Sequence, residues 1–289
     1  EHSQPPDQGE WIVTYKRIMV PVNGVDDASH ALDLAFGLGK RFAGAVMGLH
    51  AAAETSSVLP YMGESLSGAL VEDMISALDD AAEARLQAAL AAFTAAQQTS
   101  GGVAGQLTMH RGLEDDLVAR HGRLADLVVV PRPASKTALS ESPTMQAAIL
   151  DTGRPVLVAP PGQAKAVGGK ILIAWNGSSQ AARAMTAAMP LLREAEAVTL
   201  LHIEESSSGA PTADAAVEYL AAHGCDAQAV LQPRGHHAVT DALLLAAINQ
   251  GADLLVMGAY THRRIRELIF GGATLEALLD APIPVLMAH

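Results

Sequence analysis

Short apolar runs recur along this chain and alternate with stretches in which apolar residues return at helical spacing. Each run is apolar on both faces, which is typical of strands in a parallel sheet that helices cover on both sides. The first half predicts strands at 17–22, 45–51, 106–110, 126–131 and 155–159, with helices near 27–42, 70–98, 113–122 and 143–152. The second half predicts strands at 170–175, 197–203, 228–232, 253–258 and 284–288, with helices near 178–193, 211–223, 239–250 and 272–280.

Four sequence blocks occur twice, in the same order, which indicates an internal duplication. The blocks 17–24, 48–51, 125–130 and 154–159 return at 170–177, 200–203, 252–257 and 283–288. Strands alternating with helices predict βαβ units. The expected fold is therefore α/β, with two tandem, doubly wound, five-stranded parallel-sheet domains of Rossmann-like type. We expect a pseudo-twofold axis between them and a separate sheet in each.

Composition shifts divide the chain into four parts. Residues 1–15 predict a disordered tail, residues 16–161 the first domain, and residues 170–289 the second. The stretch 162–169 follows Pro160 and Pro161 and contains three glycines, which is typical of a linker. The first half is longer because of an insertion between Ala52 and about Asp73, which is either a surface loop or a lid or partner-docking segment.

The charge balance and the cysteine count limit the function classes. The 289 residues include 19 Lys and Arg against 31 Asp and Glu, a net charge of −12, which argues against nucleic acid as the partner. Cys225 is the only cysteine, so an internal disulfide is excluded and a reducing cytoplasm is expected. The apolar runs are strand-sized, and no membrane partner or secretion signal is expected.

The candidate chemistry follows the fourth strand of the second half. Gly258 ends that strand, and Gly271 and Gly272 precede a predicted helix that begins around Ala273 and Thr274. Glycines just before a helix can expose several N–H donors to a phosphate, and the helix dipole favours the negative charge. The arginines within 263–266 either reach such a phosphate or form a solvated face.

In this segment the chain resembles the universal stress protein family. Nucleotide-binding members carry Gly, two residues, Gly, nine residues, Gly and then Ser or Thr between the fourth strand and the last helix. Gly258 and Gly271 match this pattern, whereas Thr261 replaces the second Gly and Gly272 replaces the Ser or Thr. Because a β-branched residue resists positive φ, either the loop takes another path or Thr261 contributes its own hydroxyl. Alternatively, the glycines only let the last helix pack on the sheet.

The resemblance also implies a pocket for the base at the end of the first strand of the second half. Asn176 stands where the family has Asp, and an amide can both donate to and accept from an adenine edge. Ile203 would pack on the base, Met257 would line the pocket, and Tyr260 would lie near the ribose or phosphates. For the neighbouring Trp175, packing against the sheet is the favoured interpretation. The predicted nucleotide-binding residues are Ala174, Asn176, Ile203, Met257, Gly258, Tyr260, Thr261, Gly271, Gly272, Ala273 and Thr274.

The equivalent loop of the first half is degenerate. Pro131 stands at the position of Gly258, and Ala134 at that of Thr261. The run 141–145 contains a further proline where Gly271 would be, and each proline removes an N–H donor. Ser142 and the following proline predict the cap and first turn of a helix instead.

Histidines suggest metal sites that the spacing does not support. His50 and His202 occupy equivalent strand positions in separate domains, which favours hydrogen-bonded, half-buried histidines. His236 and His237 lie in a predicted loop without partners at metal-ligand spacing. The chain also lacks a P-loop, GxGxxG and GxSxG, so no catalytic residue and no metal ligand is assigned.

The resulting hypothesis is a cytoplasmic stress-response protein whose second domain binds an adenine nucleotide, ATP with Mg²⁺, and whose first domain does not. It would act as a regulator or binding module. The alternatives are a structural interaction protein with empty pockets, and a slow ATPase that uses Thr274 and a metal ion. The two halves would form an intrachain pseudo-dimer, and a homodimer of whole chains stays open.

Overall fold

The computed structural model describes residues 14–25, 27–52, 68–133, 142–162, 167–203, 211–233, 239–259 and 281–289. The first half contains β1 (Arg17–Pro21), α1 (Ser29–Arg41), β2 (Ala45–Ala52), α2 (Gly68–Thr99), β3 (Gly105–Arg111), α3 (Glu114–Gly122), β4 (Leu127–Pro131), α5 (Pro143–Leu150) and β5 (Val156–Ala159). The second half contains β6 (Lys170–Trp175), α6 (Ser179–Ala187), α7 (Met189–Leu192), β7 (Ala197–Ile203), α8 (Ala213–Ala222), β8 (Gln228–Gln232), α9 (Val239–Gln250), β9 (Leu254–Gly258) and β10 (Val285–Ala288).

The ten predicted strands are present at the predicted places, and the described helices agree with two exceptions. The helix predicted at 178–193 is divided into α6 and α7, because Pro190 lies in the first turn of α7 and cannot continue the hydrogen bonding of α6. The insertion is partly helical, since α2 already begins at Gly68. The helix predicted near 272–280 lies outside the described residues.

The two halves share one sheet, which corrects the expectation of two separate sheets. The strand order is β3-β2-β1-β4-β5-β10-β9-β6-β7-β8. Pairing within each half is parallel, as predicted, whereas β5 and β10 pair antiparallel at the centre. Each of these strands would otherwise be the edge of a five-stranded sheet, and joining them satisfies backbone groups that an edge leaves unpaired.

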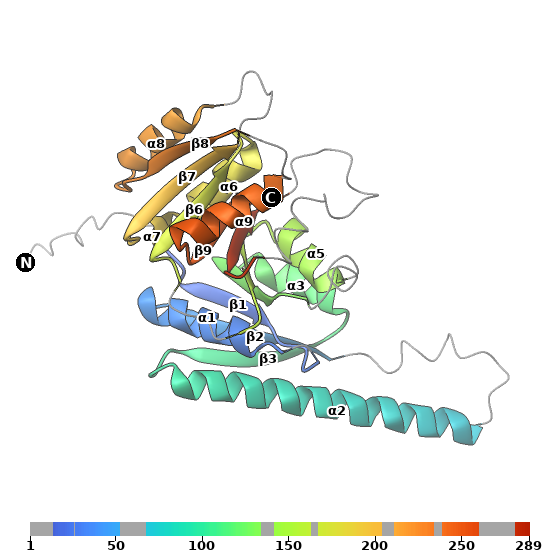
Figure 1. The fold of residues 1–289 in the computed structure, drawn as a ribbon. Coiled ribbons are helices and arrows are strands. Elements are labelled where there is room, and N and C mark those ends of the chain that lie inside the picture. The colour runs from blue at the N-terminus through green and yellow to red at the C-terminus, as the bar shows by residue number, and fades with distance from the viewer. Residues whose placement is uncertain are drawn as a thin grey trace, which may run out of the picture.

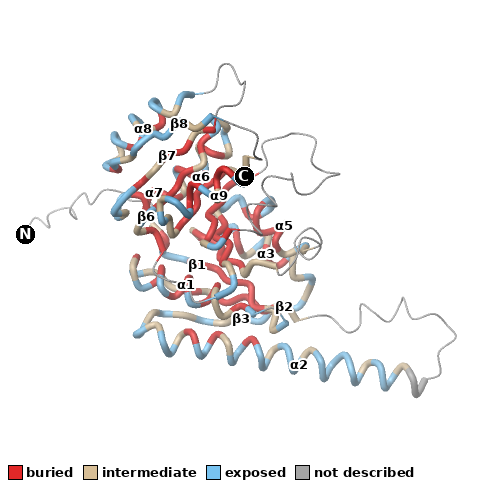
Figure 2. Tube along the Cα trace, viewed as in Figure 1, coloured by how far each residue is buried: buried red, intermediate tan, exposed pale blue. Residues whose placement is uncertain are grey.

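Helices cover both faces of the long sheet (Figure 1). One buried cluster includes residues of α1, α2, α6, α7 and α8, and the other includes residues of α3, α5 and α9. Both clusters contain residues of both halves, and the buried segments run continuously through the middle of the molecule (Figure 2). The halves therefore have a common core rather than two independent ones.

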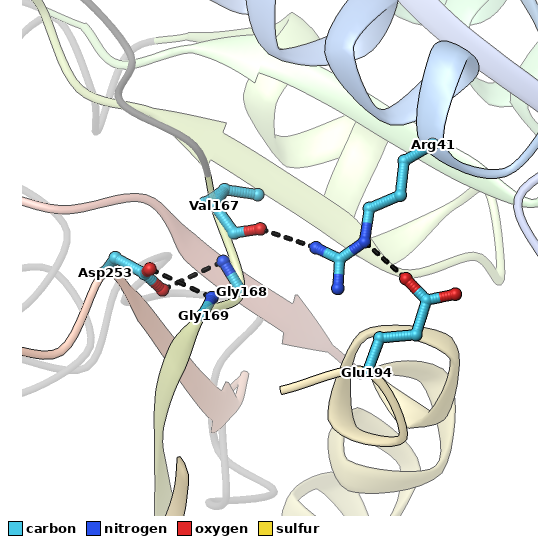
Figure 3. Close-up of polar contacts among 6 residues, drawn as sticks. All are labelled: Arg41, Val167, Gly168, Gly169, Glu194 and Asp253. Carbon is cyan, nitrogen blue, oxygen red and sulfur yellow. Dashed lines mark hydrogen bonds and ion pairs between the residues drawn. The ribbon is translucent and has the colours of Figure 1, made fainter. Parts of the chain in front are cut away.

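The aspartate of the repeated Ala-Asp block fastens the start of the first strand in each half. Asp126 Oδ2 accepts hydrogen bonds from the backbone N–H groups of Lys16 at 2.9 Å and Arg17 at 2.8 Å. The carboxylate of Asp253 accepts from Gly168 at 2.8 Å, Gly169 at 2.9 Å and Lys170 at 3.2 Å. The last residues of the predicted linker are thus held in place by the second half (Figure 3).

Polar contacts join the halves beside this point. Arg41 of α1 donates from Nη1 to the carbonyl oxygen of Val167 at 2.8 Å, and its Nε forms an ion pair with Glu194. Figure 3 shows that the guanidinium lies between these two partners. One α1 side chain thereby holds both the connecting segment and the end of α7.

A buried tyrosine makes another contact between the halves. The Tyr15 hydroxyl donates to the carbonyl oxygen of Ala187 at 2.7 Å, and the residue is 1% exposed. Burial raises the pKa of the Tyr15 phenol, because the charged form would lose its hydration. Tyr15 is therefore part of the core and does not belong to the disordered tail predicted for residues 1–15. Residues 1–13 lie outside the described residues.

Candidate functional site

The predicted base pocket lies at the carboxyl edge of the second half, where β9, β6 and β7 are neighbours. Ala174 of β6 pairs in register with Met257 of β9, and β7 ends one residue beyond His202 at Ile203. Ile203 is 6% exposed and Met257 8% exposed, and Ala174 packs against the same buried cluster. The structure thus brings these three predicted residues together on the sheet face that α9 covers.

A tight turn after β6 places Asn176 at the rim of this edge. Asn176 is exposed, and its Oδ1 accepts a hydrogen bond from Ser178 N at 3.1 Å. Gly177 has a φ of +70°, which an L-residue with a side chain rarely adopts. Ser178 then caps α6 by accepting from Ala181 N at 3.1 Å. The first half repeats the turn, with Asn23 Oδ1 accepting from Val25 N at 2.9 Å.

Gly258 has a packing role in addition to the proposed contact with phosphate. A Cβ atom at this position would lie 2.6 Å from Ala181 N and 2.8 Å from the carbonyl carbon of Gln180. The end of β9 therefore passes directly against the first turn of α6, and only glycine fits there. After it, Ala259 is fully buried and donates from its N–H to the Ala288 carbonyl oxygen at 2.9 Å.

The remaining part of the predicted phosphate loop lies outside the described residues. This applies to Tyr260, Thr261, Gly271, Gly272, Ala273 and Thr274. It also applies to the arginines within 263–266 and to His236 and His237. The structure therefore places five of the predicted site residues: Ala174, Asn176, Ile203, Met257 and Gly258.

Trp175 and the paired histidines have structural roles. Trp175 is 5% exposed, belongs to the cluster on the opposite sheet face, and donates from Nε1 to the Pro211 carbonyl oxygen at 3.1 Å. His50 Nδ1 lies 2.7 Å from the Val22 carbonyl oxygen, and His202 Nδ1 lies 3.0 Å from that of Trp175. Each histidine thus ties the end of one strand to the strand before it. The predicted hydrogen bonds are confirmed for both histidines; His202 is half-buried as predicted, whereas His50 is fully buried.

The first half has a cavity of about 500 Å³ at its own carboxyl edge. Pro131 and Pro143 line it, and so do the carboxylates Asp27 and Glu114. Ser142 caps α5 by accepting from Met145 N at 3.2 Å, as the sequence predicted. The cavity therefore combines prolines, which lack an N–H donor, with acidic side chains.

Two side chains around this cavity were missed by the sequence reasoning. Two hydrogen bonds from Ser29 hold the pKa of Asp27 below its usual range, so this carboxylate stays charged. His30 Nδ1 is buried without a hydrogen-bond partner among the described residues. The available signal was the position of Asp27 at the start of the first predicted helix, where acidic residues are favoured.

Comparison with known proteins agrees with this geometry. The sequence profile of the Universal stress protein family matches residues 169–289. A universal stress protein from Archaeoglobus fulgidus DSM 4304 superposes with a TM-score of 0.70 at 15% identity, covering 96% of this chain and 97% of that chain. A functionally unknown protein from Pseudomonas aeruginosa PAO1 gives a TM-score of 0.58 at 14% identity, covering 95% and 92%. Comparison with curated proteins gave no match.

The fold is that of a tandem α/β protein whose second half has its switch point between β9 and β6. Residues 169–289 belong to the universal stress protein family, and the whole chain has the fold of two such domains in tandem. Within the residues that the structure describes, no helix is long and apolar enough to span a membrane.

Proposed function

We propose that the second half binds one adenine nucleotide, ATP with Mg²⁺, and that the chain acts as a nucleotide-responsive binding protein in the stress response. One observation carries this proposal. Ala174, Ile203 and Met257 lie close together at the carboxyl edge of the sheet, next to the exposed Asn176. Strand order reverses between β9 and β6, and ligands of open α/β sheets bind where the order reverses.

The described residues suit the base. Ile203 and Met257 offer an apolar surface against which an adenine ring can lie. Asn176 uses Oδ1 for the turn, so its Nδ2 is the group that would donate to a ring nitrogen. The family's aspartate can only accept a hydrogen bond from the base, whereas Nδ2 of Asn176 can donate one. This donor suits adenine, because the ring nitrogens of adenine accept hydrogen bonds.

The phosphates would lie beyond Gly258, along the loop that contains Gly271 and Gly272. The sequence pattern supports this part of the proposal, because both glycines precede a predicted helix, and Gly258 and Gly271 match the spacing of the family's nucleotide loop. Thr261 would supply a hydroxyl group at one position where the chain departs from that pattern, and Thr274 would supply one two residues beyond the other, Gly272.

The first half is proposed not to bind ATP. Asp27 and Glu114 line its cavity, and carboxylates repel a polyphosphate. Pro131 and Pro143 remove two backbone donors from the same wall. Arg132, the cation at this edge, donates to the Ala281 carbonyl oxygen at 2.6 Å and so stabilises the contact between the halves.

Isothermal titration of the chain with ATP and Mg²⁺ tests the proposal. One site per chain is expected, and AMP should bind more weakly than ATP if the glycine loop contacts the outer phosphates. The proposal would be rejected if ATP gave no heat at millimolar concentration. A stoichiometry of two would show that the first-half cavity also accepts nucleotide.

A further inference from the structure

The first half of helix α2 extends beyond the body of the protein. The helix has 32 residues, which corresponds to a length of about 48 Å. Among residues 71–99, whose burial the structure describes, the buried ones are Ala89, Phe93 and Ala96, all in the second half of the helix. Figures 1 and 2 show that the N-terminal part continues past the edge of the sheet, largely exposed.

The helix meets the body of the protein from about Arg85 onward. The backbone carbonyl of Arg85 lies against Gly24, so closely that a Cβ atom there would collide with it. Phe93 then packs edge-to-face on Phe36 of α1, with ring centroids 5.4 Å apart. Gln97 Nε2 donates to the Gly105 carbonyl oxygen at 3.0 Å. Residues 71–84 include no buried side chain.

The apolar face of α2 nevertheless continues through the extended part. The α2 stripe comprises Val71, Met74, Ile75, Leu78, Ala82 and Leu86. Its spacing of three and four residues leads directly into the buried series at positions 89, 93 and 96. Met74 and Leu78 are each 40% exposed. A face of this kind normally packs against another element, and among the described residues only its last third does so.

One side of the α2 stripe is strongly acidic. Glu72, Asp79 and Glu83 are exposed and recur at helical spacing along that side. Residues 71–88 carry five carboxylates and one cation, Arg85. The surface therefore pairs an apolar stripe with a negative border.

The negative border distinguishes among the partners that could cover the α2 stripe. Two copies of the chain would each bring the same negative segment, and in an antiparallel pair of identical helices each acidic border would face its own copy. Anionic lipid would be repelled for the same reason. A helix with an apolar stripe and a positive border fits both features, as in coiled coils whose flanking charges set partner choice.

We propose that residues 71–86 of α2 form a docking surface for a basic amphipathic helix of a partner protein. The stripe spans about four helical turns, so a partner helix of about 15 residues would cover it. Apolar side chains of the partner would cover Met74 and Leu78, and its Lys or Arg side chains would lie against Glu72, Asp79 and Glu83.

A labelled peptide of about three heptads, with Ile at a, Leu at d and Lys at e and g, tests the proposal by fluorescence anisotropy. The matched control peptide has Glu in place of each Lys. With the full chain near physiological salt, we expect the Lys peptide to bind at least about tenfold more tightly than the Glu peptide. Failure of the Lys peptide to bind at millimolar protein overturns the proposal.

Two pairs of variants separate docking from general attraction to an acidic protein. Met74→Gln with Leu78→Gln should weaken binding of the Lys peptide at least about tenfold. The matched control is Leu245→Gln with Ile248→Gln on α9, where both residues are exposed, and it should leave the affinity unchanged. Circular dichroism checks that both folds are retained. Equal effects of the two pairs, or no effect of the α2 pair, would reject the surface.

Reversing the charge border completes the test. Glu72→Lys with Glu83→Lys should shift the preference toward the Glu peptide, whereas Asp214→Lys with Glu218→Lys on α8 should not. Analytical ultracentrifugation of the unmodified chain tests whether a second copy of the chain binds the α2 stripe instead. Self-association that Met74→Gln with Leu78→Gln abolishes would assign the surface to a second copy and overturn the proposal.

Discussion

Leu157 pairs with Leu286, which is its own counterpart in the repeat, at the centre of the antiparallel junction between β5 and β10. On either side, Val158 pairs with Val285 and Val156 with Met287. The register is symmetric about this leucine pair, so the pseudo-twofold axis passes beside it. Both leucines are fully buried.

Truncation of either leucine should destabilise the whole chain. We expect Leu157→Ala and Leu286→Ala each to lower the free energy of unfolding by about 2–5 kcal/mol, because each leaves a cavity in a buried layer. Urea denaturation followed by circular dichroism measures the loss. Because both core clusters span the two halves, unfolding should remain a single transition. Two separate transitions in the wild-type chain would show that the halves fold independently.

The predicted phosphate loop from Gly258 to Gly272 can be tested with one variant that should lose affinity for ATP and one that should gain it. Gly271→Val should abolish ATP binding while the fold is retained, because the side chain would occupy the place of a phosphate. Thr261→Gly restores the family pattern and should tighten binding by ~1 kcal/mol, or about fivefold.

Calorimetry and melting temperature should be measured together on both loop variants. If the glycines serve only the packing of the last helix, Gly271→Val would lower the melting temperature and Thr261→Gly would not improve affinity. That result would reject the phosphate contact even where weak binding persists.

The aspartate clamp at the linker predicts a local loss of stability. Asp253→Ala removes three backbone hydrogen bonds to a carboxylate and should cost about 2–3 kcal/mol of unfolding free energy. Asp126→Ala removes two such bonds and should cost less. Asp33→Ala, at an exposed position of α1, is the control and should change stability little. Equal stability of the Asp253 and Asp33 variants in urea denaturation would contradict a clamping role.

A histidine pair predicts pH dependence on the acidic side of neutrality. The rings of His110 and His121 lie 4.3 Å apart. Partial burial, and then the neighbouring His110 and Arg120, lower the pKa of His121. His121 therefore binds a proton at higher pH in the unfolded chain than in the folded chain. As a result, the free energy of unfolding falls as the pH drops below about 6.5.

His121→Gln removes this proton and should flatten the dependence. The urea midpoint of the variant should change less between about pH 7 and about pH 5 than that of the wild type. His223→Gln, a histidine on the second half that stacks on Tyr219, is the control. A wild-type midpoint that rises as the pH falls through this window would contradict the sign of the effect.

Most strands were predictable because each is an apolar run that the chain repeats. The pattern could not show the β5–β10 junction, since alternation and burial report which faces of a strand are covered, not what lies along its edge. The sequence around Leu157 would show the same apolar run whether β5 were the edge strand of a sheet or paired with β10. Likewise Gly258 follows the motif spacing, but its contact with Gln180 and Ala181 joins residues about 80 positions apart and needed the structure.

The junction at Leu157 and Leu286 also has a consequence for how such a chain can change over time. When two identical subunits meet at this edge, a substitution that blocks the binding site of one subunit also blocks that of the other. A covalent chain that pairs unlike halves removes that restriction. Pro131 and Pro143 could therefore accumulate on one side while the glycines persisted on the other, and each half became free to acquire a separate task.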